Sequence, residues 1–367
     1  MTVESTTTTS GSRPGRVGKV SAVVINYQGE AYLEACIRSI QALEDPVDEI
    51  VVVENASSDG SLNILNTHFR SVVLLRMREN VGASIARNVG LRAAKHRFVL
   101  LVDNDVILAP DTLTKLRAVM DAREDLVMLQ PRAVYKSDPT RVHYDGGALH
   151  YGGLISLRNS GAPLASVQSA GAVDVDVVIS LALLVDKKAV VEVGGFDEEM
   201  FILFEDLDLC YRLRSGGHGL ALVEDAVVQH DSGTPGISFR GGSYPERRVF
   251  LHSRNRWIYI AKNYRLWTLL LSAPALCVYE VAWFAFAAKQ GNVGAWLRGK
   301  RAFFGHARRL WQKRRKVQRM RRVGDRRLLV GGPLTLSPGI AGGQGLGARG
   351  LDAMLRGWWA IVRWFVV

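Results

Sequence analysis

The sequence predicts an α/β protein in which helices flank a mainly parallel sheet, followed by a helical region that associates with a membrane. Over the first half of the 367-residue chain, β-branched apolar runs alternate with amphipathic stretches. Such alternation is typical of a parallel sheet covered on both faces. After Arg240 the sequence becomes basic and aromatic, which predicts the second region.

Each element follows from local periodicity. The first two thirds of the chain predict strand 20–27, helix 30–43, strand 48–55, strand 72–75, helix 83–95 and strand 98–102. Residues 130–171 are Gly-rich and are expected to be irregular, and residues 175–186 predict one apolar strand. A helix is expected to start near Glu205, and a last strand is expected to end at His230. Ligands of such sheets bind beyond the carboxyl ends of the strands.

Composition and charge divide the chain. Hydrophobic residues make up 48% of it, enough for a large core, and the three cysteines form no CxxC motif, which argues against a disulfide framework or zinc cluster. Residues 240–330 carry 22 Lys+Arg against 3 Asp+Glu, whereas the remainder carries 25 against 32. We expect a solvated tail without a secretion signal at 1–18, a globular domain at 19–240, a basic aromatic helical region at 241–330, a Gly/Pro-rich linker at 331–350 and an amphipathic helix at 351–367.

Two carboxylates end the strand in "LLVDNDVILA". In an extended chain Asp103 and Asp105 point to the same side while Asn104 points away. Two like charges held together favour a bound cation, although short acids also serve simply to turn the chain.

A second acidic loop follows another strand. In "ENASSDGS", Glu54, Asn55 and Asp59 should lie on the same sheet edge as the aspartate pair. The helix that opens at Gly82 then contains Arg87 and Asn88. A diphosphate near its N-terminus would meet backbone N–H groups and a guanidinium.

A third acidic group opens the helix in "FEDLDLCYR". Glu205, Asp206 and Asp208 either cap this helix or stand against the apolar wall of the preceding "GGFDEEMFILF". A carboxylate beside an apolar surface and other acids has its proton affinity raised, which suits a general base. His230, at the end of the last strand, is a candidate third ligand for a cation held by Asp105.

Together these stretches resemble the family 2 glycosyltransferases with the GT-A fold. The resemblance covers roughly residues 20–235, with "VVINYQG", "ENASSDGS", "NVGASIARNVG", "VDNDV", "GGFDE" and "FEDLDLCYRLR" in the family's order. Within the family the chain is most similar to bacterial rhamnosyltransferase-type enzymes that extend lipid-linked glycans.

The resemblance implies an inverting, metal-dependent transferase that moves one sugar, such as L-rhamnose, from a nucleoside-diphosphate donor to a glycan or polyprenyl-linked acceptor. It implies that Asp206 is the catalytic base and that Glu205 positions the acceptor or the base. Mg²⁺ or Mn²⁺ would be held by Asp103, Asp105 and His230. The nucleotide-sugar would be held by Tyr27, Glu54, Asn55, Asp59, Arg87, Asn88, Asp103 and Asn104.

The sequence departs from the family at Ser180, where many relatives carry Gly, and this would crowd a site near the sugar or acceptor. "SRNRW" at 253–257 is similar to the QxxRW signature of processive synthases, but Ser253 replaces Gln. One alternative is a sugar nucleotidyltransferase, although "NYQGEAYL" is no Gly-rich triphosphate loop. Another is a non-catalytic protein that recruits RNA or anionic lipid, against which the two acidic pairs and His230 argue.

Residues 266–288 form an apolar stretch long enough to cross a bilayer. Pro274 and Glu280 are expected to interrupt it, and both flanks are basic, so that one span conflicts with the positive-inside rule. We expect a re-entrant hairpin or interfacial helices, helped by an amphipathic, Trp-rich C-terminus. The expected location is the cytoplasmic face of the bacterial inner membrane, with anionic lipid rather than nucleic acid as partner.

Overall fold

The computed structural model describes residues 15–167, 169–230, 233, 236–238, 244–335 and 345–367. Its centre is a ten-stranded mixed sheet, with β10-β12-β6-β11-β4-β1-β2-β3 as its main path and β5 and β7 paired to β12 and β6. The strands of this sheet are β1 (Val20–Asn26), β2 (Glu49–Glu54), β3 (Val73–Arg76), β4 (Phe98–Asp103), β5 (Ile107–Leu108), β6 (Leu126–Val134), β7 (Val142–Tyr144), β10 (Ala172–Asp174), β11 (Ala182–Asp186) and β12 (Gly219–Gln229).

The parallel part of the sheet confirms the predicted fold class. Strands β1, β2, β3 and β4 pair in parallel, as do β6 and β12, whereas β11 runs antiparallel between β4 and β6. The helices that accompany the sheet are α1 (Leu33–Gln41), α2 (Ser61–His68), α3 (Gly82–Ala93), α4 (Thr112–Ala122), α5 (Lys187–Glu192) and α6 (Glu205–Ser215). The carboxyl ends of β1, β2 and β4 therefore meet at one edge.

Apolar residues bury both faces of the sheet. In β1, Val23 and Ile25 belong to one buried cluster, whereas Ala22 and Val24 belong to a second one on the opposite face. Since successive side chains of a strand alternate between faces, a fully apolar strand of this kind needs cover on both sides.

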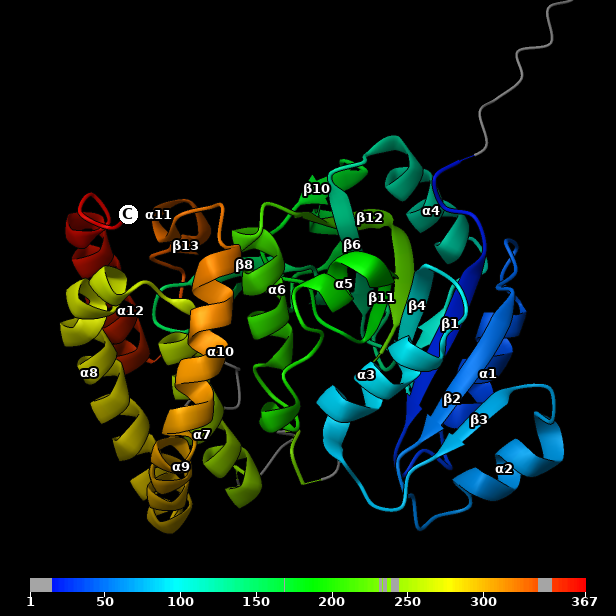
Figure 1. Cartoon of the computed structure of the whole chain (residues 1–367), viewed down its shortest axis with the longest axis horizontal. Coiled ribbons are helices and arrows are strands. Elements are labelled where there is room, and N and C mark those ends of the chain that lie inside the picture. The colour runs from blue at the N-terminus through cyan, green and yellow to red at the C-terminus, as the bar shows by residue number, and fades with distance from the viewer. Residues whose placement is uncertain (1–14, 168, 231–232, 234–235, 239–243, 336–344) are drawn as a thin grey trace, which may run out of the picture.

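The C-terminal region is a bundle of helices beside the sheet domain (Figure 1). Its helices are α7 (Glu246–Asn263), α8 (Leu266–Lys289), α9 (Val293–Gly305), α10 (Ala307–Met320), α11 (Asp325–Leu328) and α12 (Leu346–Val362). A three-stranded sheet of β13 (Leu329–Val330), β8 (Gly147–His150) and β9 (Leu154–Leu157) joins the two regions. The segment that follows α10 thus contributes a strand to a sheet built from the middle of the chain.

Three expectations about local structure were wrong. Residues 130–171 contain strands β7, β8 and β9 and the short 3₁₀ turn η1 (Leu164–Ser166) instead of an irregular loop. Of the apolar run 175–186, only β11 is a strand. Residues 15–18 do not belong to a solvated tail, because Val17 is buried and its N–H donates to Asp121 at 2.6 Å. The rest of that predicted tail lies outside the described residues.

Helix α8 is continuous, which corrects the expectation of a re-entrant hairpin. Pro274 lies inside the helix without ending it. Glu280 is turned toward the bundle, where Trp257 Nε1 donates to it at 2.7 Å and Trp296 Nε1 at 2.9 Å. Among the described residues α8 is the one helix long and apolar enough to cross a membrane by length and composition. The predicted linker 331–350 is also shorter, since α12 begins at Leu346.

Candidate functional site

One cleft of about 2360 Å³ opens at the carboxyl ends of the parallel strands and continues to the C-terminal helices. Most of the side chains predicted to form a site line it. These are Tyr27, Asn55, Asp59, Arg87, Asp103, Asn104, Asp105, Glu205, Asp206 and His230. The fold therefore brings together four motifs that are separated by up to two hundred residues in sequence.

The part of the cleft beyond β1 and β2 is built by a network of amides and carboxylates. Asn104 Nδ2 donates to Asn26 Oδ1 at 2.7 Å, and Asn26 in turn donates to Glu54 at 2.5 Å. Glu54 is buried, also accepts from the backbone N–H of Ser57, and does not line the cleft. Its observed contacts shape the loop, whereas Asn104 stands at the cleft surface.

Asp59 stabilises the same loop, which follows β2. Its carboxylate accepts from the N–H groups of Glu30 at 2.9 Å and Ser61 at 3.1 Å. Asn55 Oδ1 accepts from the N–H of Val81 at 3.0 Å and so ties this loop to the start of α3. Both residues line the cleft, although their observed partners are protein groups.

Arg87 is the electrostatic centre of the site. Its Nη2 donates to both carboxylate oxygens of Asp103, at 2.9 and 3.2 Å, and to the Ser180 carbonyl at 3.0 Å. Its Nη1 donates to Glu205 at 3.0 Å. Arg87 is only 5% exposed, and a guanidinium is tolerated there because carboxylates surround it. Its positive charge is thus compensated by Asp103 and Glu205 within the lining of the cleft.

Asn88, which the resemblance assigns to the nucleotide-sugar, does not line the cleft and is held by protein groups. Its side chain is buried, donates to the Phe196 carbonyl at 2.9 Å and accepts from the Phe196 N–H at 2.9 Å. The side chain also donates to Glu198 in the 3₁₀ turn η2 (Glu198–Met200). Because α3 turns successive side chains by about 100°, Arg87 reaches the cleft while Asn88 reaches the opposite layer.

Asp105 and His230 form the pair that suits a divalent cation. Asp105 Oδ2 lies 3.3 Å from His230 Nε2 and accepts from the Gly233 N–H at 2.8 Å. Burial opposes ionisation of Asp105, but these hydrogen bonds hold its pKa below the ordinary value. A carboxylate oxygen and an imidazole nitrogen are ligands that Mn²⁺ accepts, and Mg²⁺ in enzymes takes one or two carboxylates together with substrate phosphates.

No larger set of ligands converges around that pair. In the described part of the chain no group of three His, Cys, Asp or Glu side chains is placed to hold a metal, and Asp103 is bound by Arg87. His143 lies against His230, with 3.1 Å between their Nδ1 atoms, and its Nδ1–H donates to the His230 carbonyl at 2.8 Å. The metal ligands present therefore fit a cation held by Asp105 and His230. Asp103 is bound to Arg87 instead.

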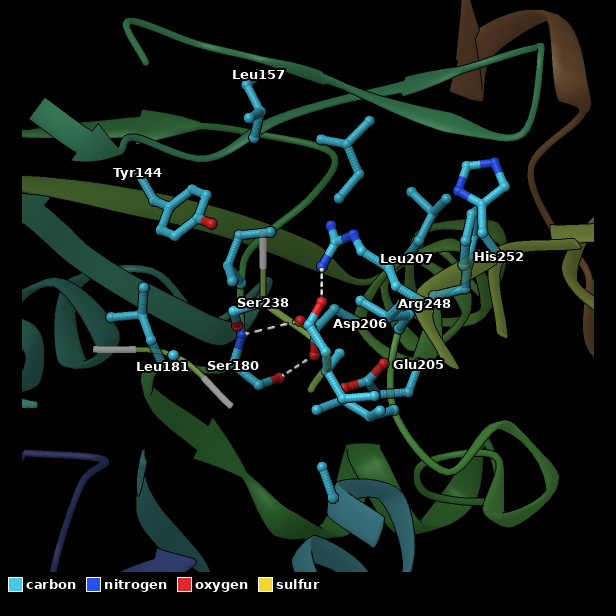
Figure 2. A pocket seen from close by; sticks show the side chains of 18 of the residues that line it. Tyr144, Leu157, Ser180, Leu181, Glu205, Asp206, Leu207, Ser238, Arg248 and His252 are labelled. Carbon is cyan, nitrogen blue, oxygen red and sulfur yellow. Dashed lines mark hydrogen bonds between the residues drawn. The ribbon is translucent and has the colours of Figure 1, made fainter. Parts of the chain in front are cut away.

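Asp206 lies at the middle of the cleft, beside Ser180 (Figure 2). The N–H of Ser180 donates to Asp206 Oδ2 at 3.3 Å, and the Ser180 hydroxyl donates to Oδ1. The neighbouring Glu205 is buried, and this burial together with the charge of Asp206 raises its pKa to about 8, against the pull of Arg87. Asp206 is the more accessible of the two carboxyl groups, since Glu205 is buried and held by Arg87.

The loop that delivers these two acids has an unusual backbone. Phe201, Leu203 and Phe204 have φ of 64°, 69° and 74°, a left-handed conformation that costs about 1 kcal/mol or more for such side chains. Gly82 meets this loop, since a Cβ there would lie 2.6 Å from the Phe201 carbonyl oxygen. Only glycine permits that approach.

Asn255 of α7 holds this loop in place. Its buried Nδ2 donates to the carbonyls of Met200 at 2.8 Å, Ile202 at 3.0 Å and Leu203 at 2.8 Å. Arg254 Nη2 adds bonds to the carbonyls of Glu199 and Met200, at 3.0 and 3.2 Å. Residues of "SRNRW" therefore position the loop that precedes Asp206.

The cleft continues from Asp206 into the C-terminal helices. Arg248 and His252 of α7 lie on the other side of Asp206 from Ser180 (Figure 2). Arg248 Nη1 donates to the Ile237 carbonyl at 3.0 Å. Beyond them the lining is aromatic and apolar, and it consists of Tyr279, Ala282, Trp283, Ala285, Phe286, Ala348 and Leu351.

Sequence reasoning missed the roles of Asn255 and Arg248 and treated Ser180 only as a crowding group. The signal for Ser180 was its departure from glycine, and the signal for Asn255 was its place in the altered "SRNRW" motif. Neither showed that the side chain bonds to Asp206 or to the loop before it, because those contacts join segments 26 and 55 residues apart.

Family models match most of the sheet domain and part of the bundle. Residues 21–170 match the model described as glycosyl transferase family 2, and residues 98–312 match glycosyl transferase family group 2. The second match includes α7, α8 and α9 and ends within α10, so that it covers part of the bundle.

Curated relatives are distant. The chain is 24% identical over 243 residues to the amylovoran biosynthesis glycosyltransferase AmsE of Erwinia amylovora, covering 65% of this chain and 80% of that protein. It is 23% identical over 257 residues to the dTDP-rhamnosyl transferase RfbF of Shigella flexneri, covering 67% and 81%. Matches to two Bacillus subtilis relatives span only 41% and 39% of those proteins. The crystal structure of S. aureus TarS 1-349 in complex with UDP aligns with a TM-score of 0.47 and 17% identity, covering 92% of this chain and 89% of that one.

Proposed function

The chain belongs to the family 2 glycosyltransferases, and from that premise we propose that it transfers one sugar from a nucleoside-diphosphate donor to a glycan acceptor with inversion at the anomeric carbon. The observation that carries this proposal is the position of the Asp206 carboxylate in the middle of the cleft. Asn55, Asp59 and Asn104 line one half of this cleft, and the C-terminal helices line the other half.

We assign the donor to the half of the cleft at the carboxyl ends of β1, β2 and β4. Tyr27 offers a ring, and Asn55, Asp59 and Asn104 offer hydrogen-bonding groups to a nucleoside. The similarity to RfbF, a dTDP-rhamnosyl transferase, and the sequence resemblance support L-rhamnose, carried on dTDP, as the first donor to test.

In the reaction Asp206 accepts the proton of the acceptor hydroxyl while that oxygen attacks the anomeric carbon. The new C–O bond forms as the bond to the diphosphate breaks, and the bonding pair leaves with the nucleoside diphosphate. Ser180 keeps the carboxylate aimed through its two hydrogen bonds. Arg87 compensates the carboxyl group of Glu205, which lies beside Asp206.

Asp105 and His230 would hold Mg²⁺ or Mn²⁺, which offsets the charge that develops on the departing diphosphate. Arg87 contributes indirectly, since it fixes Asp103 on the donor side and Glu205 beside the base. Asp105 and His230, at the ends of β4 and β12, would therefore stabilise the charge on the diphosphate. Asp206, at the start of α6, would remove the proton from the acceptor.

We propose a lipid-linked acceptor of the polyprenyl class. The support is the second half of the cleft, where Arg248 stands near Asp206 and an aromatic, apolar lining of Tyr279, Trp283 and Phe286 follows. A cation followed by an apolar groove matches a phosphorylated head attached to a hydrocarbon chain. AmsE, named for amylovoran biosynthesis, supports polysaccharide synthesis as the setting.

We also propose that the bundle lies on the cytoplasmic face of the inner membrane. Large apolar side chains are exposed on four of its helices, α8, α9, α10 and α12, among them Trp267, Leu270, Phe284, Phe304, Trp311 and Ile361. Soluble surfaces rarely present so many large apolar groups beside a high density of Lys and Arg. Peripheral attachment would bring the apolar end of the cleft to the depth of a lipid-linked acceptor.

A donor screen tests the proposal. Purified protein is incubated with a panel of nucleoside-diphosphate sugars, a lipid-linked acceptor extract and Mg²⁺ or Mn²⁺, and release of nucleoside diphosphate is measured. We expect release with one donor class that depends on the acceptor. Release of pyrophosphate from nucleoside triphosphate and sugar phosphate would instead identify a nucleotidyltransferase.

A further inference from the structure

A second, smaller pocket of about 430 Å³ lies between the start of α8 and α10, away from the cleft. It is lined by Arg265, Leu266, Trp311, Arg314, Arg315, Gln318 and Arg321. Four of these seven residues are arginines, and the proposed glycosyl transfer gives none of the four a role.

The floor of this arginine pocket is rigid. Arg314 Nη1 donates to the carbonyls of Ala261 and Tyr264, at 2.6 Å each, and Arg321 Nη1 donates to the Asn263 carbonyl at 3.0 Å. These bonds satisfy the last carbonyls of α7 and fix both guanidinium groups. The pocket is therefore part of the folded core of the bundle rather than a chance gathering of mobile side chains.

The pocket carries uncompensated positive charge. Within the described ranges Arg265, Arg314 and Arg315 form no ion pair with an acidic side chain, and the acid paired with a pocket arginine is Asp325, bound to Arg321. Arg314 is buried and Arg321 Nε is a buried N–H without a hydrogen-bond partner. An anion entering the pocket would relieve this excess of charge.

The rim of the pocket is apolar and exposed. Leu266 and Trp311 line it with 60% and 56% of their surface open, and Trp267 and Leu270 continue along α8 with 54% and 64% open. A site for a free anion or for a nucleic-acid backbone does not need such a rim, whereas a lipid headgroup carries hydrocarbon chains next to its phosphate.

The end of the chain extends this surface. The Arg265 N–H donates to Asp325 at 2.8 Å, and the Asp325 N–H donates to the Val367 carbonyl at 3.1 Å. Arg326 lies over the Trp364 ring, 4.7 Å from its centre. The starts of α8 and α11 and the end of α12 thus meet at one end of the bundle (Figure 1).

We propose that the arginine pocket binds the phosphate of an anionic membrane phospholipid, whose acyl chains lie along Leu266, Trp267, Leu270 and Trp311. This rests on the proposed membrane location of the bundle and adds a defined headgroup site to it. The site would set the orientation of the enzyme on the bilayer, because it lies apart from the cleft that receives the substrates.

The experiment uses full-length protein and flotation with vesicles of phosphatidylcholine alone or of phosphatidylcholine with phosphatidylglycerol. The pocket variant is R265Q/R315Q. The matched control is R309Q/K316Q, which removes the same charge from the other face of α10, where Lys316 lies near Gly194 and Arg309 near Glu199. A charge-preserving R265K/R315K variant and thermal melting of every protein monitor folding.

We expect wild type to float with the anionic vesicles only. R265Q/R315Q should lower its partition coefficient by about 30-fold, since each basic group near an anionic surface strengthens binding by roughly fivefold. R309Q/K316Q and R265K/R315K should stay within about threefold of wild type. Glycerol phosphate, offered alone in calorimetry, should bind weakly because it lacks the acyl chains.

Equal losses of vesicle binding in the pocket and control variants would overturn the proposed headgroup site, but not the proposed membrane attachment of the bundle. Failure of wild type to bind anionic vesicles would overturn both. Tight binding of glycerol phosphate or of single-stranded RNA, sensitive to R265Q/R315Q while vesicle binding is not, would reassign the pocket to another anion. Release of nucleoside diphosphate in the donor screen is measured without vesicles, so failure of the glycosyltransferase proposal is recognised separately.

Discussion

Ser180 donates two hydrogen bonds to Asp206, one from its backbone N–H at 3.3 Å and one from its hydroxyl. The same residue offers its carbonyl to Arg87 at 3.0 Å. A glycine would keep the two backbone contacts but not the hydroxyl. The serine therefore adds a donor aimed at the carboxylate that we assign as the base.

The variant S180A should lower kcat by about tenfold and leave the donor KM within a factor of about two, since a hydrogen bond to a charged group is worth 1.5–3 kcal/mol. S180T, which keeps the hydroxyl, should restore kcat. Wild-type kcat in S180A would show that the hydroxyl does not act on the base.

Asn255 is expected to matter for both stability and turnover. The variant N255A removes the side-chain donor of the Ile202 and Leu203 carbonyls and one of the donors of the Met200 carbonyl, which should lower the free energy of unfolding by about 2 kcal/mol. The left-handed loop should then relax and reduce kcat by more than tenfold. Urea unfolding and initial rates measure the two effects. N66A on the exposed face of α2 is the control, and equal behaviour of the two variants would contradict the account.

Metal dependence should reside in Asp105. Calorimetry of nucleoside diphosphate with Mn²⁺ or with EDTA should give affinities that differ by at least about tenfold for wild type, because a cation shared with the diphosphate strengthens binding. In D105A the two affinities should coincide. Retention of the metal effect in D105A would exclude this residue as a ligand.

His150 should make the fold sensitive to acid. Its ring is fully buried and accepts from the Gly152 N–H at 2.9 Å, and burial lowers its pKa from 6.5 to about 4. Between pH 6.5 and about pH 4, His150 is protonated in the unfolded chain but not in the folded chain. The free energy of unfolding therefore falls as the pH drops through this range. The loss should approach about 3 kcal/mol, at roughly 1.4 kcal/mol per pH unit.

The comparison for that prediction is H150N, which keeps an acceptor for Gly152 and cannot titrate. H150N should start less stable but show a shallower decline between pH 6.5 and 4 in chemical denaturation. Identical slopes for wild type and H150N would assign the acid sensitivity to other groups.

The sheet domain could be predicted because its strands are continuous apolar runs. β1 and β4 are buried on both faces and are apolar or small up to their last residues, Asn26 and Asp103, so that the pattern is visible without any partner. The strands β7, β8 and β9 were missed because each has only three or four residues, and pairing rather than local preference makes them strands.

The bundle shows why tertiary partners limit sequence interpretation. Glu280 was expected to break an apolar stretch, yet Arg256, Trp257, Trp296 and Lys300 of α7 and α9 surround it. In the site, the convergence of Asp105 with His230 was predictable from strand ends. The engagement of Arg87 with three acidic or carbonyl groups was not, since it depends on the packing of α3 against α6.

The variant D206N tests the central claim most directly. It keeps the shape of the side chain and the hydroxyl of Ser180 beside it, but removes the acceptor for the proton of the attacking hydroxyl. Acceptor-dependent release of nucleoside diphosphate should fall by at least about 1,000-fold, while calorimetric affinity for the nucleoside diphosphate stays within about threefold of wild type. D225N, an exposed charge change on β12, should retain wild-type turnover. Normal turnover in D206N would contradict the assignment of Asp206 as the base.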